Sequence, residues 1–128
     1  RCSLPDDDTT RRLERPYIRA YAIHVRFGWD ARKSARNLRE RGFDFEFATQ
    51  IFDGVTVERT DTRRDYGETR LVALGQAQGI LLTVVYTDRA GGGRVERRII
   101  SARKSNRRER KAYAEAIRRK ASGDAGSR

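Results

Sequence analysis

The stretch that decides the fold is Arg98-Ile99-Ile100-Ser101-Ala102-Arg103-Lys104-Ser105-Asn106-Arg107-Arg108-Glu109-Arg110. Its first half is apolar and β-branched, which is typical of a strand. Ser105-Asn106 then predicts a turn, and Asn106-x-x-Glu109 resembles the capping box that begins a helix. Cations therefore gather where a strand ends and a helix begins, a place with free backbone N–H groups and a positive dipole end. Such a junction suits a phosphate ligand.

The residues before this junction predict a run of strands joined by short connections. Residues 69–74 and 80–86 predict two strands with a hairpin loop over 75–79. Because residues 80–86 are almost wholly apolar, that strand is expected at the centre of the sheet. Residues 88–93 predict a glycine-rich loop, and 97–102 the last strand. Connections of this length favour antiparallel pairing.

Two helices are expected nearer the N-terminus. Alternating apolar and polar residues over 22–27 predict a strand. Asp30 is a suitable N-cap for a first helix that Gly42 ends, and Asp44 for a second, short one. The apolar residues expected to pack in and around these helices are Ala31, Ala35, Leu38, Trp29, Phe43, Phe45, Phe47 and Phe52. Their spacing favours a core over a base-stacking surface.

The whole order predicts an α+β fold. A short strand is expected over 55–58, an exposed loop over 60–67, and a final basic helix with Tyr113, Ala116 and Ile117 on a narrow apolar face. The expected architecture is an antiparallel β-sheet packed against two N-terminal helices, with a basic C-terminal helix. The expected organisation is a single domain over 21–120, with a poorly ordered lead-in over 1–20 and a flexible Gly/Ser tail over 121–128.

The positive charge of the chain is concentrated at one end. The net charge is +11, and residues 89–120 hold 13 Lys/Arg against 3 Asp/Glu. A one-ended basic surface attracts polyanions, nucleic acid above all, although a merely solvated basic helix has the same composition. Cys2 is the only cysteine, so no internal disulfide forms and a reducing compartment is favoured. One Cys and one His, His24, do not make a zinc site, and the longest apolar run is too short to span a bilayer.

Seven pieces of the chain, taken in order, resemble the BrnT family of type II toxins, whose members share the RelE-like ribonuclease fold. The likeness runs from about Phe27 to Tyr113. It departs from the family pattern at Glu40-Arg41-Gly42, where relatives usually have Lys-His-Gly, and in a longer loop over 90–94. The matching pieces are 27–30 with Lys33, 37–39, 42–45, Ala48 with 52–53, 68–70 with 74–75, 85–89, and 98–104 with 107–110 and Tyr113.

The resemblance implies a cytoplasmic toxin that cleaves RNA without a metal and inhibits translation. It also implies a small BrnA-type antitoxin as partner, with a ribbon-helix-helix domain through which the complex would bind operator DNA. No cofactor and no membrane partner are expected. Two other functions fit the residues: a non-catalytic nucleic-acid-binding module that uses the basic helix, and an interaction subunit whose cations meet an acidic partner.

RNA cleavage by 2′-hydroxyl attack needs a base, an acid, and cations that stabilise the charge developing on phosphorus. The expected catalytic residues are Arg70, Arg89, Arg103, Lys104, Glu109 and Tyr113, and the expected RNA-binding residues are Arg98, Arg107, Arg108 and Arg110. Arginine is too basic to take a proton, so arginines only orient and neutralise. Regular strand alternation places Arg98 on the face opposite Arg103, unless the strand bulges.

Each expected role has a structural alternative. Arg103 is as well suited to a surface ion pair with Glu109, which is itself a capping residue. Tyr113 is suited to anchoring the helix on the core. Glu109 and Tyr113, four residues apart, share one helical face and fit a base and a hydroxyl donor. His24, the only imidazole, fits a packing role on its strand better than catalysis.

Overall fold

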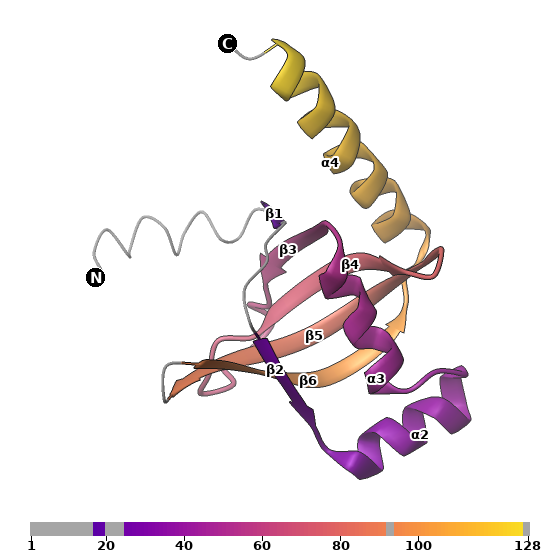
Figure 1. Cartoon of the computed structure of the whole chain (residues 1–128), viewed down its shortest axis with the longest axis vertical. Helices are drawn as coiled ribbons and strands as arrows, with labels where there is room; N and C mark the ends of the chain where they lie inside the picture. Colours follow the sequence, from indigo (N-terminus) through magenta and orange to yellow (C-terminus); the bar gives the residue numbers. More distant parts are fainter. Residues whose placement is uncertain (1–16, 20–24, 92–93, 127–128) are drawn as a thin grey trace.

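A computed structural model describes residues 17–19, 25–91 and 94–126 (Figure 1). The elements are, in chain order, β1 (Tyr17–Arg19), β2 (Val25–Trp29), α2 (Ala31–Arg41), α3 (Phe45–Ala48), the 3-10 helix η1 (Thr49–Asp53), β3 (Thr56–Thr60), β4 (Leu71–Ala77), β5 (Ile80–Gly91), β6 (Arg94–Lys104) and α4 (Arg107–Gly126). The expected α+β class is confirmed.

One mixed sheet organises the described residues, with strand order β1-β3-β4-β5-β6-β2. The neighbours β3, β4, β5 and β6 pair antiparallel, as does β1 with β3. β2 pairs parallel with β6, so the expectation of a purely antiparallel sheet is wrong. Short connections between consecutive strands impose antiparallel pairing on β4, β5 and β6. β2 and β6 are not consecutive in the sequence, because the helices and the strands β3 to β5 lie between them. No short connection therefore fixes their relative direction.

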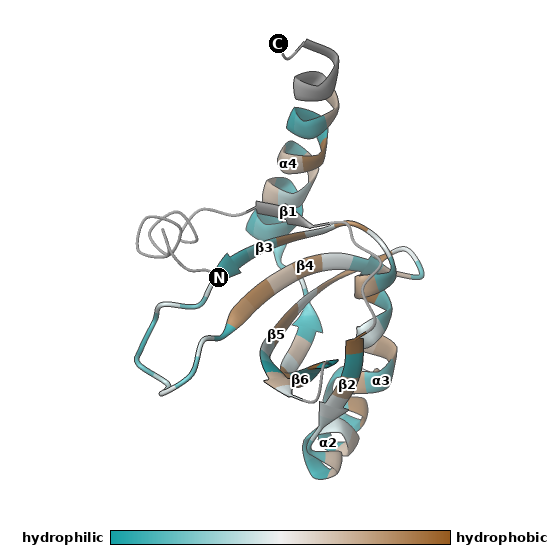
Figure 2. Ribbon diagram, turned by 60° about the vertical axis from the view of Figure 1, so that its left-hand side comes forward, coloured by the Kyte–Doolittle hydropathy of each residue, from teal (hydrophilic) through white to brown (hydrophobic). Residues whose placement is uncertain are grey.

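The core lies between one face of the sheet and the α3–η1 segment. Aromatic and aliphatic side chains from both sides form one buried cluster that includes Phe45, Ile51, Phe52, Leu82 and Tyr86. The residue at position 75 is glycine because η1 crosses here: a Cβ on Gly75 would lie 2.8 Å from Cβ of Ile51. Figure 2 shows hydrophobic colour along β4 and hydrophilic colour over the loop between β3 and β4.

Helix α2 begins and ends as predicted but does not bury the predicted face. The Asp30 carboxylate accepts from two backbone N–H groups at its start, and Gly42 ends it with φ of 89°. Ala31, Ala35 and Leu38 are exposed. The buried positions are instead Ser34 and Asn37, whose side chains hydrogen-bond the backbone of Phe45 and of Phe43. Polar side chains face inward here because they satisfy the backbone of the α2–α3 turn.

The β4–β5 and β5–β6 connections are shorter than predicted. β4 continues to Ala77, and the turn is Gln78-Gly79, both with positive φ as a type I′ turn requires. The predicted loop over 88–93 is mostly strand, because β5 extends to Gly91 and β6 begins at Arg94. Arg97 and Asp88 lie opposite each other on this ribbon and form two hydrogen bonds of 2.8 and 2.7 Å.

Both predicted ends of the domain differ in the described residues. Tyr17–Arg19, inside the expected lead-in, form β1 and pair with β3. Residues 1–16, which include Cys2, lie outside the described residues, and so does His24. Helix α4 extends to Gly126, into the expected tail, and projects away from the sheet (Figure 1). Near the start of α4, the Tyr113 hydroxyl donates a 3.1 Å hydrogen bond to the carbonyl of Val55, the residue before β3.

Candidate functional site

The face of the sheet opposite the core carries the predicted cations. Along β5, Leu82, Val84 and Tyr86 belong to the buried core cluster, so Thr83 and Thr87 point to the other face. Thr83 lies opposite Arg103, and Thr87 opposite Arg98. Directly opposed residues share a face, and therefore both arginines lie on the face away from the core.

A β-bulge brings these two arginines onto one face. Val85 pairs with Ser101 and Tyr86 with Ile99, which leaves Ile100 as the extra residue in β6. Ile99 and Ala102, three apart, are accordingly both in the core cluster. Regular alternation would place Arg98 and Arg103 on opposite faces, and the exception allowed for it, a bulge in the strand, is what the structure has.

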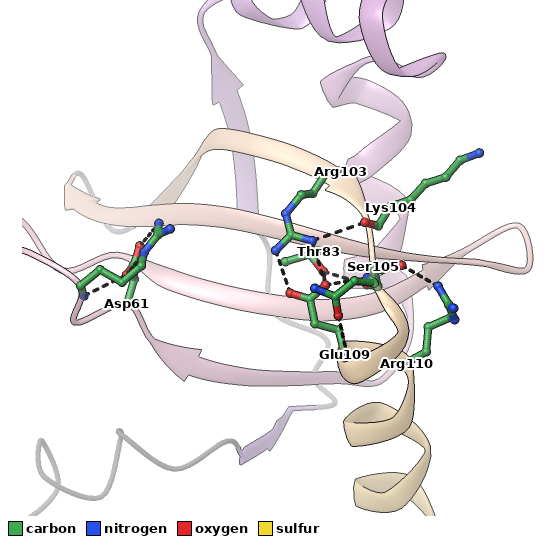
Figure 3. Close-up of polar contacts among 9 residues, drawn as sticks. Asp61, Thr83, Arg103, Lys104, Ser105, Glu109 and Arg110 are labelled. Carbon is green, nitrogen blue, oxygen red and sulfur yellow. Dashed lines mark hydrogen bonds and ion pairs between the residues drawn. The ribbon is translucent and has the colours of Figure 1, made fainter.

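The Arg103–Glu109 pair is the centre of this face (Figure 3). Two nitrogens of the Arg103 guanidinium donate to the two carboxylate oxygens of Glu109, at 2.8 and 2.7 Å. The Glu109 carboxylate also accepts from the Asn106 backbone at 2.8 Å, and the Asn106 side chain accepts from the Glu109 backbone at 2.8 Å. The predicted capping box is confirmed, and it fixes the carboxylate that holds Arg103.

The Glu109 carboxylate also contacts a buried hydroxyl group, which is paired with a second one. Thr83 Oγ1 donates to Glu109 Oε1 at 3.0 Å and lies 2.7 Å from Ser105 Oγ. Both residues are buried. Because the carboxylate is bound from the strand, the turn and the arginine, it has little freedom to rotate. Arg103 is therefore presented in one orientation, with its side chain 43% exposed.

These contacts fix the charge of the pair. Burial acts to raise the pKa of Glu109, but hydrogen bonds from Arg103, the Asn106 backbone and Thr83 outweigh it and lower that pKa to about 2. The Glu109 carboxylate in turn raises the pKa of Arg103. Both groups are charged at neutral pH. A carboxylate with so low a pKa is a poor proton acceptor, so the geometry suits Glu109 to orienting Arg103 rather than to general-base chemistry.

A second polar cluster occupies the loop between β3 and β4. Its centre is the buried carboxylate of Asp61, which accepts from the Nε and Nη2 atoms of Arg63, both at 2.8 Å. Tyr66 donates to the same carboxylate at 3.3 Å, and its ring lies 4.0 Å from the Arg70 guanidinium. Arg70 also donates to Glu68 at 3.1 Å.

Arg89 joins this cluster at its edge. Its guanidinium lies 3.7 Å from Oε1 of Glu68, the carboxylate that also accepts from Arg70. The side chain of Arg89 is 60% exposed, so this ion pair is screened by water. Of the predicted cations, Arg70 and Arg89 thus share one carboxylate.

Two expected proton carriers lie elsewhere. Lys104 is opposite Leu82, on the core face of the sheet, and lines a hollow of about 340 Å³ with Phe43, Phe47 and Ile80. Figure 3 shows its side chain pointing away from Glu109. The hydroxyl of Tyr113 is bonded to the Val55 carbonyl, and burial raises its pKa. The expected pairing of Glu109 with Tyr113 is not among the contacts of either side chain.

The predicted RNA-binding arginines of the junction have unequal surroundings. Arg107 and Arg108 are exposed in the first turn of α4. Arg110 is exposed as well, but its guanidinium donates to the Ser105 carbonyl at 2.8 Å (Figure 3). Arg98 is half-buried in β6. All four stay candidates for phosphate contacts.

The residues of these clusters that were missed as site residues from the sequence are Asp61, Arg63, Tyr66, Glu68, Thr83 and Ser105. Thr83 carried a signal, because it interrupts an otherwise apolar strand and a buried hydroxyl needs a partner. Asp61 and Arg63 fall in a stretch rich in exposed charge, where nothing in the sequence distinguishes a buried carboxylate from its neighbours. Their roles depend on the fold of the loop.

Within the described ranges, no group of His, Cys, Asp and Glu side chains is arranged to hold a metal ion. The same residues include no helix with the length and apolar character needed to cross a membrane.

Comparison with known proteins agrees with the sequence resemblance. A family model described as "Ribonuclease toxin, BrnT, of type II toxin-antitoxin system" matches residues 29–109. The matched region begins at the end of β2 and includes both polar clusters, ending at the carboxylate that holds Arg103. A search of curated proteins found no match.

Proposed function

The chain belongs to the BrnT family of ribonuclease toxins from type II toxin–antitoxin systems, and from this premise we propose that it is a metal-independent endoribonuclease with a RelE-like fold. The observation that carries the proposal is Arg103, held by the fixed carboxylate of Glu109 on the sheet face that also bears Arg98. A positioned guanidinium is what a phosphodiester needs when charge develops on phosphorus.

Arg103 neutralises the scissile phosphate in this proposal, and Glu109 positions Arg103. Arg98, Arg107, Arg108 and Arg110 bind the flanking RNA backbone, and Arg70 and Arg89 extend the positive surface beyond them. The RNA supplies the nucleophile, its own 2′-hydroxyl. Of the two described proton carriers expected near this face, Lys104 lines a hollow on the core face and the Tyr113 hydroxyl is bonded to the Val55 carbonyl. The proposed catalysis therefore consists chiefly of charge stabilisation and orientation, which suits a slow nuclease.

The cellular setting follows the family. RNA cleavage would inhibit translation in the cytoplasm, and an antitoxin would neutralise the toxin. We propose a BrnA-type, ribbon-helix-helix antitoxin that binds operator DNA for the complex. An acidic surface on that partner would cover the exposed cations and block RNA from the same face, so one contact would both bind and inhibit.

The test is cleavage of end-labelled structured RNA by purified protein in EDTA, beside Arg103→Ala and Arg32→Ala. Arg32 is an exposed arginine of α2, an element that carries none of the proposed site residues, and serves as the matched loss of one positive charge. Discrete cleavage by the wild type and by Arg32→Ala, and a loss of about a hundredfold in Arg103→Ala, are expected. Equal loss in both variants would contradict a specific role for Arg103.

A non-catalytic nucleic-acid-binding module is the second candidate. The observation that favours it is the pairing of Arg103 with Glu109, which leaves the described part of this face without an evident proton carrier. Intact RNA in the same assay, together with a salt-sensitive gel shift, would decide for this alternative.

A further inference from the structure

Asp61 is a buried carboxylate whose hydrogen bonds organise the β3–β4 loop. Its side chain is 1% exposed, and it accepts from the Nε, Nη2 and backbone N–H of Arg63 and from the hydroxyl of Tyr66. These bonds, those from Arg63 first, lower the pKa of Asp61 to about 2. Burying a carboxylate costs free energy unless a positive charge and hydrogen-bond donors compensate it. Arg63 supplies both, so the buried Asp61 keeps the Arg63 side chain in place.

The guanidinium that Asp61 holds faces outward. The side chain of Arg63 is 74% exposed, in contrast to its buried partner. Two of its five N–H donors bind Asp61. The bidentate contact fixes the plane of the guanidinium and leaves the Nη1 side directed away from the carboxylate. An exposed arginine that is anchored in this way is oriented before any ligand arrives.

Asp61 is on the same face of the sheet as Arg103. In β3, Thr56 and Glu58 contact the core side, where Glu58 accepts from Tyr86 and Thr56, so the alternate position 57 points to the other face. Asp61 continues this alternation, since its backbone N–H extends the ladder to the Arg70 carbonyl at 2.8 Å. Figure 3 shows Asp61 to the left of the group formed by Thr83, Arg103 and Glu109, with part of the sheet between them.

The charges of Arg63 and Arg103 also interact. The hydrogen bonds from Glu109 raise the pKa of Arg103, and the positive charge of Arg63 acts in the opposite direction. Two guanidiniums are thus held by separate carboxylates, on separate elements, and their positive charges act on each other. An anion that contacts both would relieve this repulsion.

We propose that Arg63, held by Asp61, forms a second phosphate-binding subsite that binds the RNA backbone next to the phosphate contacted by Arg103. The inference rests on the proposed function and adds to it the Asp61–Arg63 pair as part of the substrate-binding surface. Arg63 is a binding residue in this scheme, and Asp61 is a positioning residue that acts through it.

The test separates binding from cleavage. The probe is a labelled single-stranded oligodeoxynucleotide with uracil in place of thymine, which has the phosphate backbone of the RNA but no 2′-hydroxyl to attack it. It is titrated by fluorescence anisotropy, at several salt concentrations, with the wild type and with Arg63→Ala, Arg63→Lys and Arg64→Ala. Arg64 is the exposed neighbour and the matched control for lost charge. Binding about tenfold weaker in Arg63→Ala, with a salt slope smaller by about one, is expected, and Arg64→Ala should bind as the wild type does.

The lysine variant tests orientation, because lysine keeps the charge but not the bidentate contact. Arg63→Lys should bind between the wild type and the alanine variant. Thermal melts of all variants verify folding, and Asp61→Asn provides a second disturbance of the orientation if it melts as the wild type does. Equal binding by Arg63→Ala and Arg64→Ala, or no binding by the wild type, would overturn the inference.

The outcome is independent of the proposed activity. A wild type that binds this uncleavable probe through Arg63 but leaves natural RNA intact contradicts the nuclease and keeps the subsite. Cleavage of natural RNA with unchanged binding and turnover in Arg63→Ala keeps the nuclease and removes the subsite.

Discussion

At the scale of single residues, Glu109 connects the fold to the proposed chemistry. It caps α4, accepts from Thr83 and binds Arg103 through both carboxylate oxygens. The capping role was predictable from the spacing of Asn106 and Glu109. The ion pair of Glu109 with Arg103 was predicted only as an alternative to a catalytic role for these residues. The sequence does not reveal that Thr83 hydrogen-bonds the Glu109 carboxylate and holds it in place. The Glu109 side chain thus both caps α4 and orients the partly exposed guanidinium of Arg103.

Glu109→Gln separates these two roles. Glutamine keeps the length and the acceptor needed for the capping box, but it loses the charge that holds Arg103. Cleavage of RNA should fall by about tenfold to a hundredfold, while helix content by circular dichroism stays constant. Glu115→Gln, later on the same helix, is the control for lost charge. A Glu109→Gln protein as active as this control would contradict the positioning role.

The low pKa values of Asp61 and Glu109 predict how stability depends on pH. Each is lowered to about 2 in the folded protein, from ordinary values of 3.8 and 4.5. Folding is therefore favoured by these carboxylates at pH above their ordinary values, and this contribution is lost as the pH falls from about 4.5 to about 2. Urea melts over this range should show falling stability. In the double variant Asp61→Asn, Glu109→Gln the fall should be smaller; an equal fall would contradict the assignment.

At the scale of elements, the bulge at Ile100 sets the composition of the site. Residues 98 and 103 differ by an odd number, and a regular strand would separate them across the sheet. The extra residue returns both to one face. Strand identity was predictable from the β-branched run, but the bulge was not, because it depends on how β5 and β6 pair. The predicted apolar face of α2 failed for a similar reason: Ser34 and Asn37 are buried by contacts with the following turn.

The crossing of η1 over β4 gives a test of the fold. Gly75→Ala would place a Cβ 2.8 Å from Cβ of Ile51 and 3.1 Å from Cγ2 of Thr56. Since the core is close-packed, a loss of about 1–3 kcal/mol in the free energy of unfolding is expected from denaturant melts. Gly54→Ala, where a Cβ meets nothing within 4 Å, is the control. Equal stability of the two variants would contradict the packing of η1 on β4.

At the scale of the whole molecule, the two faces of the sheet have separate tasks. One face packs against α3 and η1, and the other presents cations from the β3–β4 loop, β6 and the start of α4 (Figures 1 and 3). The α+β class and the helix caps followed from periodicity and capping residues. The parallel pairing of β2, and the cluster around Asp61, did not, because both depend on contacts between segments far apart in the sequence or inside a polar loop.

The most direct measurement of the central claim is the identity of the RNA ends that the wild-type protein produces in EDTA. Attack by the 2′-hydroxyl predicts a 2′,3′-cyclic phosphate and a 5′-hydroxyl, resolved by mass spectrometry. It also predicts no cleavage at a nucleotide whose 2′-hydroxyl is replaced by hydrogen, and loss of the products in Arg103→Ala. Products with 5′-phosphate ends, or products that appear only when a divalent metal is added, would contradict a metal-independent nuclease built around Arg103.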